Sequence, residues 1–272
     1  YKDSTLSRKR SSSVTLLLHG LEGDAQRPYM LGMTKLLIQN GHDVAALNFR
    51  GCSGRQNLKY RSYHSGDTGD IRFVVNYLAS LGYSKIYLYG VSLGGNALLK
   101  YLGENETIPS QVKVAASIGV PVDLKASLEQ LSKPKNVIYR TSFLVHLRAK
   151  YRAKMKLFPE FMTRKKLKQI NSLKSFDDLY TAPAHGFNDA LDYYEKASSY
   201  PYLSNIRIPT LILNAKNDSF LHGKCYPIKE ATSGKHLFLE MPAHGGHVGF
   251  YQKGDFYYNE MRSLSFFEDH SS

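Results

Sequence analysis

Ser92 is the residue with the clearest potential for chemistry, because it stands at the centre of Gly-Val-Ser-Leu-Gly at 90–94. In the pattern G-x-S-x-G, the serine lies on a sharp turn between a strand and a helix. The apolar run 85–89 is typical of a buried strand, and 93–102 has apolar residues at helical spacing. The N-terminus of such a helix directs free backbone N–H groups at the turn. The context therefore favours a nucleophilic serine over an ordinary Ser-Gly turn.

A serine hydroxyl needs a general base, and the base needs an acid that orients it. Asp218 follows an apolar run at 208–214, and a carboxylate just beyond a strand lies at the ligand-binding edge of a parallel sheet. Asp123 follows the preceding predicted strand and is the alternative acid. His247 is the expected base, and His244 in the same glycine-containing loop is the alternative.

Attack on a carbonyl carbon also requires hydrogen-bond donors for the developing oxyanion. The backbone N–H of Leu93, directly after the serine, is one expected donor. The other is expected in the loop that follows the strand at 14–18, where Leu21 occupies the appropriate position. Both assignments depend on backbone position alone, because the side chains take no part.

The elements that must position these groups alternate between strands and helices along the chain. Strands are predicted at 14–18, 43–49, 85–89, 112–120, 208–214 and 236–240, and helices at 30–38, 70–78, 93–102 and 255–267. Repeated units of this length predict a mostly parallel sheet with helices on both faces.

The alternation stops between Pro121 and Pro209, where nearly ninety residues look mostly helical. We expect a core whose first part is 1–121, a helical lid at 122–207, called the insertion below, and a second part of the core at 208–272. An apolar stripe at helical spacing runs through the insertion, at Leu144, Leu147, Tyr151, Met155 and Phe158. Core packing against the main domain is the favoured interpretation of this stripe, and lipid contact is the alternative.

Positive charge is concentrated in the same part of the chain. The 272 residues carry a net charge of +13, and the segment 133–168 holds twelve basic residues with Glu160 as its one acid. A local excess predicts a surface that meets something anionic. We expect peripheral contact of 133–168 with an anionic membrane, with a merely solvated face as the alternative. No recognised nucleic-acid motif is present, so no nucleic-acid partner is expected.

Composition narrows the class of protein further. Hydrophobic residues make up 42% of the chain, which is typical of globular proteins, and no apolar run approaches the roughly 18 residues of a membrane-spanning helix. Cys52 and Cys225 are too few for a disulfide framework, which favours a cytoplasmic location, with peripheral membrane association as the alternative. The chain starts at Tyr1, so an upstream targeting signal stays compatible with it. His64 lacks a partner at metal-ligand spacing, and no metal is predicted.

Several motifs together resemble the YheT-type branch of the α/β-hydrolase superfamily. They are the segments 19–23, 48–54, 63–66, 90–96 and 244–250, with 181–187 and 192–194 in further agreement. This branch contains carboxylesterases, medium-chain phospholipases and ethanol acyltransferases. The resemblance runs from about residue 14 to the end, and it implies an α/β-hydrolase fold.

The resemblance also carries Ser92, Asp218 and His247 over as a catalytic triad that acts without a cofactor. It implies hydrolysis of short- to medium-chain acyl esters or lipids through an acyl-enzyme. Acyl transfer to an alcohol is one alternative, and a non-catalytic lipid-surface module is another. Since thirteen residues precede Val14, the antiparallel hairpin with which this fold opens is expected to be largely absent.

Overall fold

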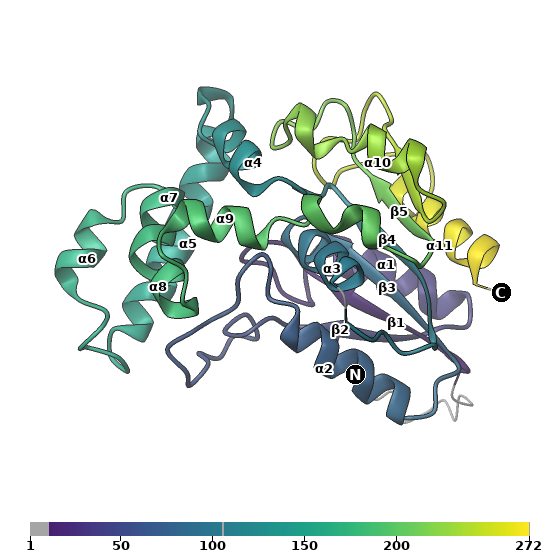
Figure 1. Ribbon diagram of the computed structural model, residues 1–272, viewed down its shortest axis with the longest axis horizontal. Coiled ribbons are helices and arrows are strands. Elements are labelled where there is room, and N and C mark those ends of the chain that lie inside the picture. The colour runs from purple at the N-terminus through teal and green to yellow at the C-terminus, as the bar shows by residue number, and fades with distance from the viewer. Residues whose placement is uncertain (1–10, 105, 272) are drawn as a thin grey trace.

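The computed structural model describes residues 11–104 and 106–271, and its centre is a sheet of six strands, all parallel, with helices around it (Figure 1). The strands lie in the order β2-β1-β3-β4-β5-β6. Their bounds are β1 Ser13–Leu18, β2 Asp43–Leu47, β3 Lys85–Val91, β4 Val112–Ile118, β5 Thr210–Leu213 and β6 Leu237–Glu240. The predicted parallel sheet is confirmed, with strand ends that differ from the prediction by a few residues.

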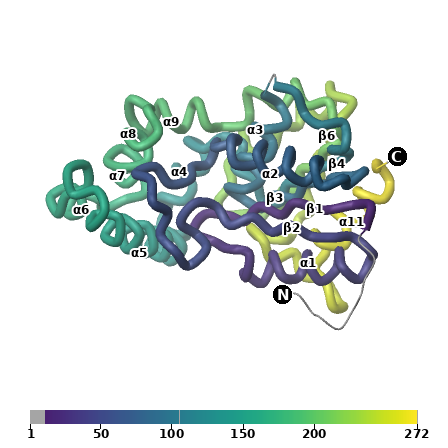
Figure 2. Tube along the Cα trace, turned by 90° about the horizontal axis from the view of Figure 1, so that it is seen from below, coloured from purple at the N-terminus to yellow at the C-terminus, as the bar shows by residue number. Residues whose placement is uncertain are grey.

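Alternation along the strands separates two apolar layers. Leu17 faces the layer formed with α1 (Pro28–Gln39) and α11 (Tyr258–His270), whereas Leu16 faces the layer formed with α2 (Gly69–Ser80) and α3 (Leu93–Gly103). Figure 2 shows α1 and α2 on opposite sides of β1 and β2. Both faces of the sheet are buried, which is why its strands appear in the sequence as continuous apolar runs.

The order in which strands are added to the sheet reverses at β1. The chain passes from β1 to β2 on one side, and β3, on the other side of β1, begins the run β3-β4-β5-β6. Loops at the carboxyl ends of β1 and β3 therefore diverge, and this is where parallel sheets bind ligands. The turn at 19–23 and Ser92 follow these two strands.

Between β4 and β5 the chain forms helices and no strand. They are α4 (Leu124–Leu131), α5 (Val137–Lys154), α6 (Arg164–Gln169), α7 (Leu173–Phe176), α8 (Ala182–His185) and α9 (Ala190–Ala197), with short 3-10 and π turns. Figure 1 shows them gathered beside the sheet instead of on its faces. The predicted helical character is confirmed, whereas the limits 122–207 of a separate unit stay a prediction. The core resumes with β5, α10 (Ile228–Ser233), β6 and α11.

The apolar stripe of the insertion is used for packing. Leu147 and Tyr151 are buried in a cluster with Ile170, Phe176 and Tyr180, and the remaining residues of the stripe are partly buried against it. Packing of this stripe is therefore confirmed, but the main domain as its expected partner is wrong for most of it. Its partners are mostly other helices of the insertion instead of the main domain.

The structure bears only in part on two predictions, the absence of an opening hairpin and the absence of a membrane-spanning helix. The expected absence of an opening hairpin falls mainly on residues 1–10, which lie outside the described residues, so it stays a prediction. Within the described residues, no helix combines the length and apolar content that crossing a bilayer requires.

Candidate active site

Ser92 lies on a strained turn between β3 and α3. Its backbone has φ 53° and ψ −118°, and among the described residues it shares a positive φ with one other non-glycine residue, Glu22. Such a conformation persists only where surrounding contacts impose it. Gly94 allows α3 to start close against β1, because a Cβ there would lie 2.5 Å from the Leu18 carbonyl oxygen. A larger residue would push the first turn of α3 away from β1.

The structure brings Ser92, His247 and Asp218 into one line of hydrogen bonds. Ser92 Oγ lies 2.8 Å from His247 Nε2, and His247 Nδ1 lies 2.7 Å from Asp218 Oδ2. The Asp218 side chain is fully buried, and its Oδ1 accepts a hydrogen bond from Phe220 N at 2.8 Å. An ionised acid accepting from Nδ1–H leaves Nε2 free to accept the serine proton.

The alternative acid and base occupy other environments. Asp123 caps α4, where its Oδ1 accepts a hydrogen bond from Ala126 N at 2.9 Å. His244 is exposed. Among the described residues, no hydrogen bond joins either of them to Ser92 or His247. The acid and base preferred from the sequence, Asp218 and His247, are thus the two that form hydrogen bonds in line with Ser92.

Two neighbours of the acid support the histidine loop, and the sequence analysis did not single them out. Asn217 Oδ1 accepts a hydrogen bond from Gly246 N at 2.8 Å, and the ring of Phe220 lies 4.4 Å from that of His247. Their positions directly beside Asp218 were the available signal. Their function depends on contacts with a loop far away in the chain, which spacing does not reveal.

The 19–23 turn after β1 contains a backbone amide without an acceptor. Gly20 N–H donates to the Tyr29 hydroxyl at 3.1 Å, and Glu22 N–H donates to the Tyr63 hydroxyl at 2.9 Å. Within the described part of the chain, the N–H of Leu21 between them has no hydrogen-bond partner. This amide is therefore available to a ligand.

The second expected donor, Leu93, is the first residue of α3, so its N–H has no acceptor within the helix. Gly20 brings the 19–23 turn close to this point, because a Cβ on Gly20 would lie 3.3 Å from Ser92 Cβ. Leu21, Leu93, Ser92 and His247 line the same pocket. Both predicted donors thus lie at the nucleophile.

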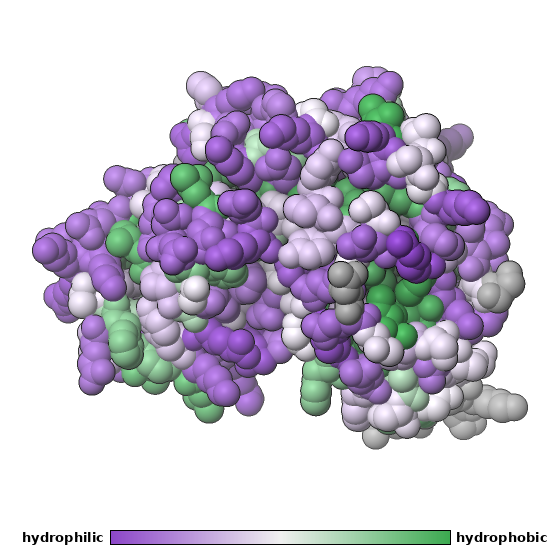
Figure 3. Space-filling view, in the orientation of Figure 1, coloured by the Kyte–Doolittle hydropathy of each residue, from purple (hydrophilic) through white to green (hydrophobic). Residues whose placement is uncertain are grey.

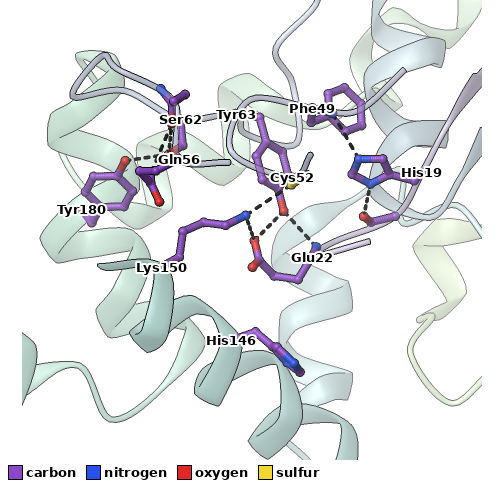
Figure 4. Close-up of polar contacts among 12 residues, drawn as sticks. His19, Glu22, Phe49, Cys52, Gln56, Ser62, Tyr63, His146, Lys150 and Tyr180 are labelled. Carbon is purple, nitrogen blue, oxygen red and sulfur yellow. Dashed lines mark hydrogen bonds and ion pairs between the residues drawn. The ribbon is translucent and has the colours of Figure 1, made fainter. Parts of the chain in front are cut away.

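His19 anchors the 19–23 turn to the core, and Figure 4 shows its two contacts. Its Nδ1–H donates to Gly20 O at 2.8 Å, and its Nε2 accepts from Phe49 N at 3.1 Å. Burial lowers the pKa of His19, so the ring is neutral. The histidine fixes the turn without taking part in proton transfer.

Residues 15–254 match the family model described as alpha/beta hydrolase fold. The chain belongs to the α/β-hydrolase superfamily. The putative esterase YheT of Escherichia coli (strain K12) is 35% identical over 239 residues, which cover 86% of this chain and 69% of the relative. The predicted resemblance to the YheT-type branch is confirmed.

Other curated relatives carry lipase names. Phospholipase ABHD3 of Mus musculus is 32% identical over 86% of this chain and 57% of its own length. A monoacylglycerol lipase of Saccharomyces cerevisiae is 30% identical over 98% of this chain and 62% of its own length. The chain therefore spans roughly three fifths of these two relatives.

Solved structures agree on the fold. The esterase PF2001 of Pyrococcus furiosus superposes with a TM-score of 0.64 at 16% identity, over 96% of this chain and 84% of the esterase chain. At this level of identity, the likeness concerns the fold alone.

In this α/β-hydrolase, an apolar pocket extends from Ser92 beneath the insertion. Its apolar lining comprises Leu124, Leu128, Leu131, Phe143, Leu147, Leu173, Phe176 and Phe220. A second hollow also reaches Ser92 and His247, and it is bordered by the 19–23 turn and by Tyr139 and His146 of α5. Ser92 thus stands between an apolar pocket and an opening beside α5.

One carboxyl group in the apolar pocket is satisfied within the protein. Asp177 accepts hydrogen bonds from the Thr181 hydroxyl and the Tyr194 hydroxyl, each at 2.7 Å. Burial raises the pKa of Asp177 to about 6. Because both oxygens are engaged, the carboxyl group is a polar part of the pocket wall. It is not free to act as an acid or base at Ser92.

One cluster of the described residues has the composition of a metal site. Ligand atoms of His64, Asp67 and His185 lie within 4.8 Å of one another, a grouping that the sequence analysis missed because His185 is distant in the chain. Gly66 N–H donates to His64 Nδ1 at 3.1 Å. The neutral ring of His64 therefore carries its proton on Nε2, where it has no lone pair for a metal. We assign no metal to this set.

The basic segment 133–168 is less exposed than its sequence suggests. Lys154 is fully buried, and its ammonium donates to Lys59 O at 2.6 Å and to Tyr60 O at 2.7 Å. Arg148 donates to Leu167 O at 2.9 Å, and Lys150 contacts the core. The expected anionic-surface contact therefore has three fewer cations available than the sequence count implies.

Proposed function

We propose that this α/β-hydrolase is a serine hydrolase of carboxylic esters. The observation that carries the proposal is the hydrogen-bonded line from Ser92 through His247 to Asp218, with distances of 2.8 and 2.7 Å. Relatives named esterase, phospholipase and lipase support it. Ser92 is the nucleophile, His247 the general base and Asp218 the orienting acid.

The geometry supports a two-step mechanism. Ser92 Oγ attacks the acyl carbonyl while His247 Nε2 takes the hydroxyl proton, and the N–H groups of Leu21 and Leu93 donate to the oxyanion. The intermediate collapses to an acyl-enzyme as His247 returns the proton to the leaving alcohol. A water molecule, deprotonated by His247, then releases the acid. Asp218 stays ionised and holds the imidazole in one tautomer throughout.

The two hollows at Ser92 suit the two halves of an ester. The apolar pocket beneath the insertion takes the acyl chain, and the opening beside α5 admits water and releases the alcohol. The polar wall at Asp177 and Tyr194 within the pocket favours short or medium chains over long ones. If an alcohol enters in place of water, the same site performs acyl transfer.

The test is hydrolysis of nitrophenyl esters with a series of acyl lengths, by the wild type and by Ser92→Ala. The variant should lose at least about three powers of ten in kcat, the scale set by triad deletions, while its melting temperature stays unchanged. Ser142→Ala removes an exposed serine at the opening beside α5 and should retain activity within a few-fold. Added ethanol separates ester synthesis from hydrolysis. Equal rates for Ser92→Ala and wild type would refute the mechanism.

We further propose that the insertion contacts an anionic membrane, where acyl esters reside. On α5, Ile138 is 78% exposed and Val145 is 59% exposed, and exposed Arg152 lies on the same helix. Tyr139 of this helix borders the opening to Ser92. Figure 3 shows hydrophobic surface among hydrophilic side chains over the insertion. Apolar and basic groups beside the site's mouth suit an anionic lipid surface. The predicted cytoplasmic location stays a prediction.

Co-sedimentation with liposomes tests this contact. Four exposed cations, Lys133, Lys135, Arg152 and Lys156, are changed together to Gln, and the matched control changes the exposed Lys224, Lys229, Lys235 and Lys253. Each cation near an anionic leaflet contributes roughly 1 kcal/mol, so the first variant should bind at least about tenfold more weakly. Binding should require anionic lipid and decrease with salt. Equal binding of both variants, or equal binding to neutral vesicles, would refute the contact.

A further inference from the structure

Glu22, next to the expected oxyanion donor Leu21, is held in a strained conformation by its side chain. Its φ is 52°, in the left-handed region that a residue with a Cβ rarely adopts. The Tyr63 hydroxyl donates to Glu22 Oε1 at 2.8 Å and accepts from Glu22 N at 2.9 Å. The ammonium of Lys150 donates to the same carboxylate oxygen at 2.8 Å. Figure 4 shows these contacts converging on Glu22.

Lys150 comes from α5, so the contact joins the insertion to the core. Its ammonium also lies 3.2 Å from Cys52 Sγ and 5.1 Å from the centre of the Tyr63 ring. The side chains of Lys150 and Glu22 are 14% and 8% exposed, respectively. An ion pair with so little exposure is weakly screened, and removal of one partner leaves the other as an uncompensated charge.

The two sides of the 19–23 turn are fixed by different parts of the molecule. His19 and Tyr29 hold the side nearer β1 through contacts within the core. Glu22 holds the other side, and one of the two partners of its side chain belongs to the insertion. The N–H of Leu21 lies between these two attachments.

We propose that Glu22 and Lys150 are positioning residues, which hold the Leu21 N–H at the oxyanion when α5 is docked on the core. The inference rests on the proposed function and adds a role for the insertion in assembling the reactive site. Neither side chain touches the reacting atoms. Their ion pair transmits the position of α5 to the turn through the Glu22 backbone.

Kinetics of Lys150→Met and Glu22→Gln test the proposal. Removal of one oxyanion donor costs about 10²–10³ in kcat, and a misaligned donor should cost less. We therefore expect kcat to fall about tenfold to a hundredfold, while KM changes by less than a few-fold. The double variant Glu22→Gln with Lys150→Met should be no slower than the worse single variant, because both changes break one contact. Lys150→Arg retains the charge and should recover part of kcat.

A second readout is specific to the oxyanion. A thionoester develops charge on sulfur, a larger and weaker acceptor, so its hydrolysis depends less on the two amides. Both single variants should therefore lower the ratio of ester to thionoester hydrolysis. Lys154→Met is the matched control, because Lys154 is buried one turn further along α5 and bonds to 59–61 instead of the turn. It should lower the melting temperature and leave the ratio unchanged.

The outcomes separate this inference from the function on which it rests. An active wild type, with ester and thionoester slowed equally in Lys150→Met and Glu22→Gln, would overturn the positioning role alone. Unchanged kcat in Glu22→Gln, the milder substitution, would do the same even if Lys150→Met failed to fold. A wild type that neither hydrolyses esters nor reacts with a fluorophosphonate would overturn both proposals.

Discussion

The core and the insertion supply the candidate site in different ways. In the core, Ser92, Asp218 and the 19–23 turn all follow the carboxyl ends of parallel strands, so one edge of the sheet gathers them. In the insertion, α5 is attached to the core by two charged side chains, Lys150 on Glu22 and Lys154 on backbone carbonyls. The sheet brings the reactive groups together, whereas the insertion is held against the core by side-chain contacts, both polar ones and the apolar packing on Leu21 and Tyr60.

This difference bears on what the charge of the insertion means. Lys154 is fully buried among three backbone carbonyls at 59–61, and burial lowers its pKa to about 8. Lysine is rarely buried without partners. A count of basic residues thus combines cations that face solvent with cations that fasten the insertion, and the two kinds respond differently to substitution.

The largest expected effect compares two aspartates, one in the loop after β5 and one at the N-cap of α4. Asp218→Asn should reduce kcat by about 10⁴, because an amide cannot hold the required imidazole tautomer. Asp123→Asn should leave kcat within a few-fold, because Asn also caps helices well. Steady-state ester hydrolysis by both variants provides the measurement. Similar losses in the two would mean that Asp218 is not the orienting acid.

A second comparison sets the buried Lys154, at the end of α5, against the exposed Lys156 just after it. Lys154→Met removes the ammonium that binds the carbonyls of 59–61, and it should cost about 2–3 kcal/mol of unfolding free energy. Lys156→Met, at an exposed position two residues away, should change stability by less than about 0.5 kcal/mol. Urea denaturation of both variants measures the difference. If they were equally stable, the lysine would not fasten the insertion.

A smaller effect concerns pH. Burial lowers the pKa of His64 and of His185 to about 3, whereas both titrate near 6.5 in the unfolded chain. As pH falls below 6.5, the unfolded chain binds protons that the folded chain does not, so stability is lost. The loss is about 2 kcal/mol for each of these histidines between pH 7 and 5. In His185→Leu, melting temperatures should fall less over this range, while exposed His146→Leu should behave as the wild type. A wild-type slope in His185→Leu would show that His185 titrates normally.

Local patterns were sufficient to predict the core. Ser92 stands in a strand–turn–helix unit, and each part of that unit can be recognised in a few residues. Asp218 and Asp123 both follow strands, so the sequence favoured Asp218 by its place in the chain and kept Asp123 as an alternative. In the structure, Asp123 is occupied as the cap of α4 and Asp218 bonds to His247. Such a choice depends on three-dimensional contacts that spacing does not contain.

The insertion was less predictable for a related reason. Its helices followed from their composition, but the burial of Lys150 and Lys154 depends on which face of α5 meets the core. Both lysines stand in a run of alternating cations that resembles a solvated face. His185 beside His64 is a similar case, because the two rings meet only after α8 is placed against the loop before α2.

The measurement that tests the central claim most directly is covalent labelling by a fluorophosphonate, followed by peptide mass spectrometry. The account predicts that the folded wild type is labelled at Ser92 and at no other serine. His247→Ala should reduce the labelling rate by at least about a hundredfold, because a general base contributes a factor of this order. A fluorophosphonate-reactive hydrolase in the same reaction controls for the reagent. Folded wild type that stays unlabelled while the control reacts, or label on a serine other than Ser92, would contradict the account.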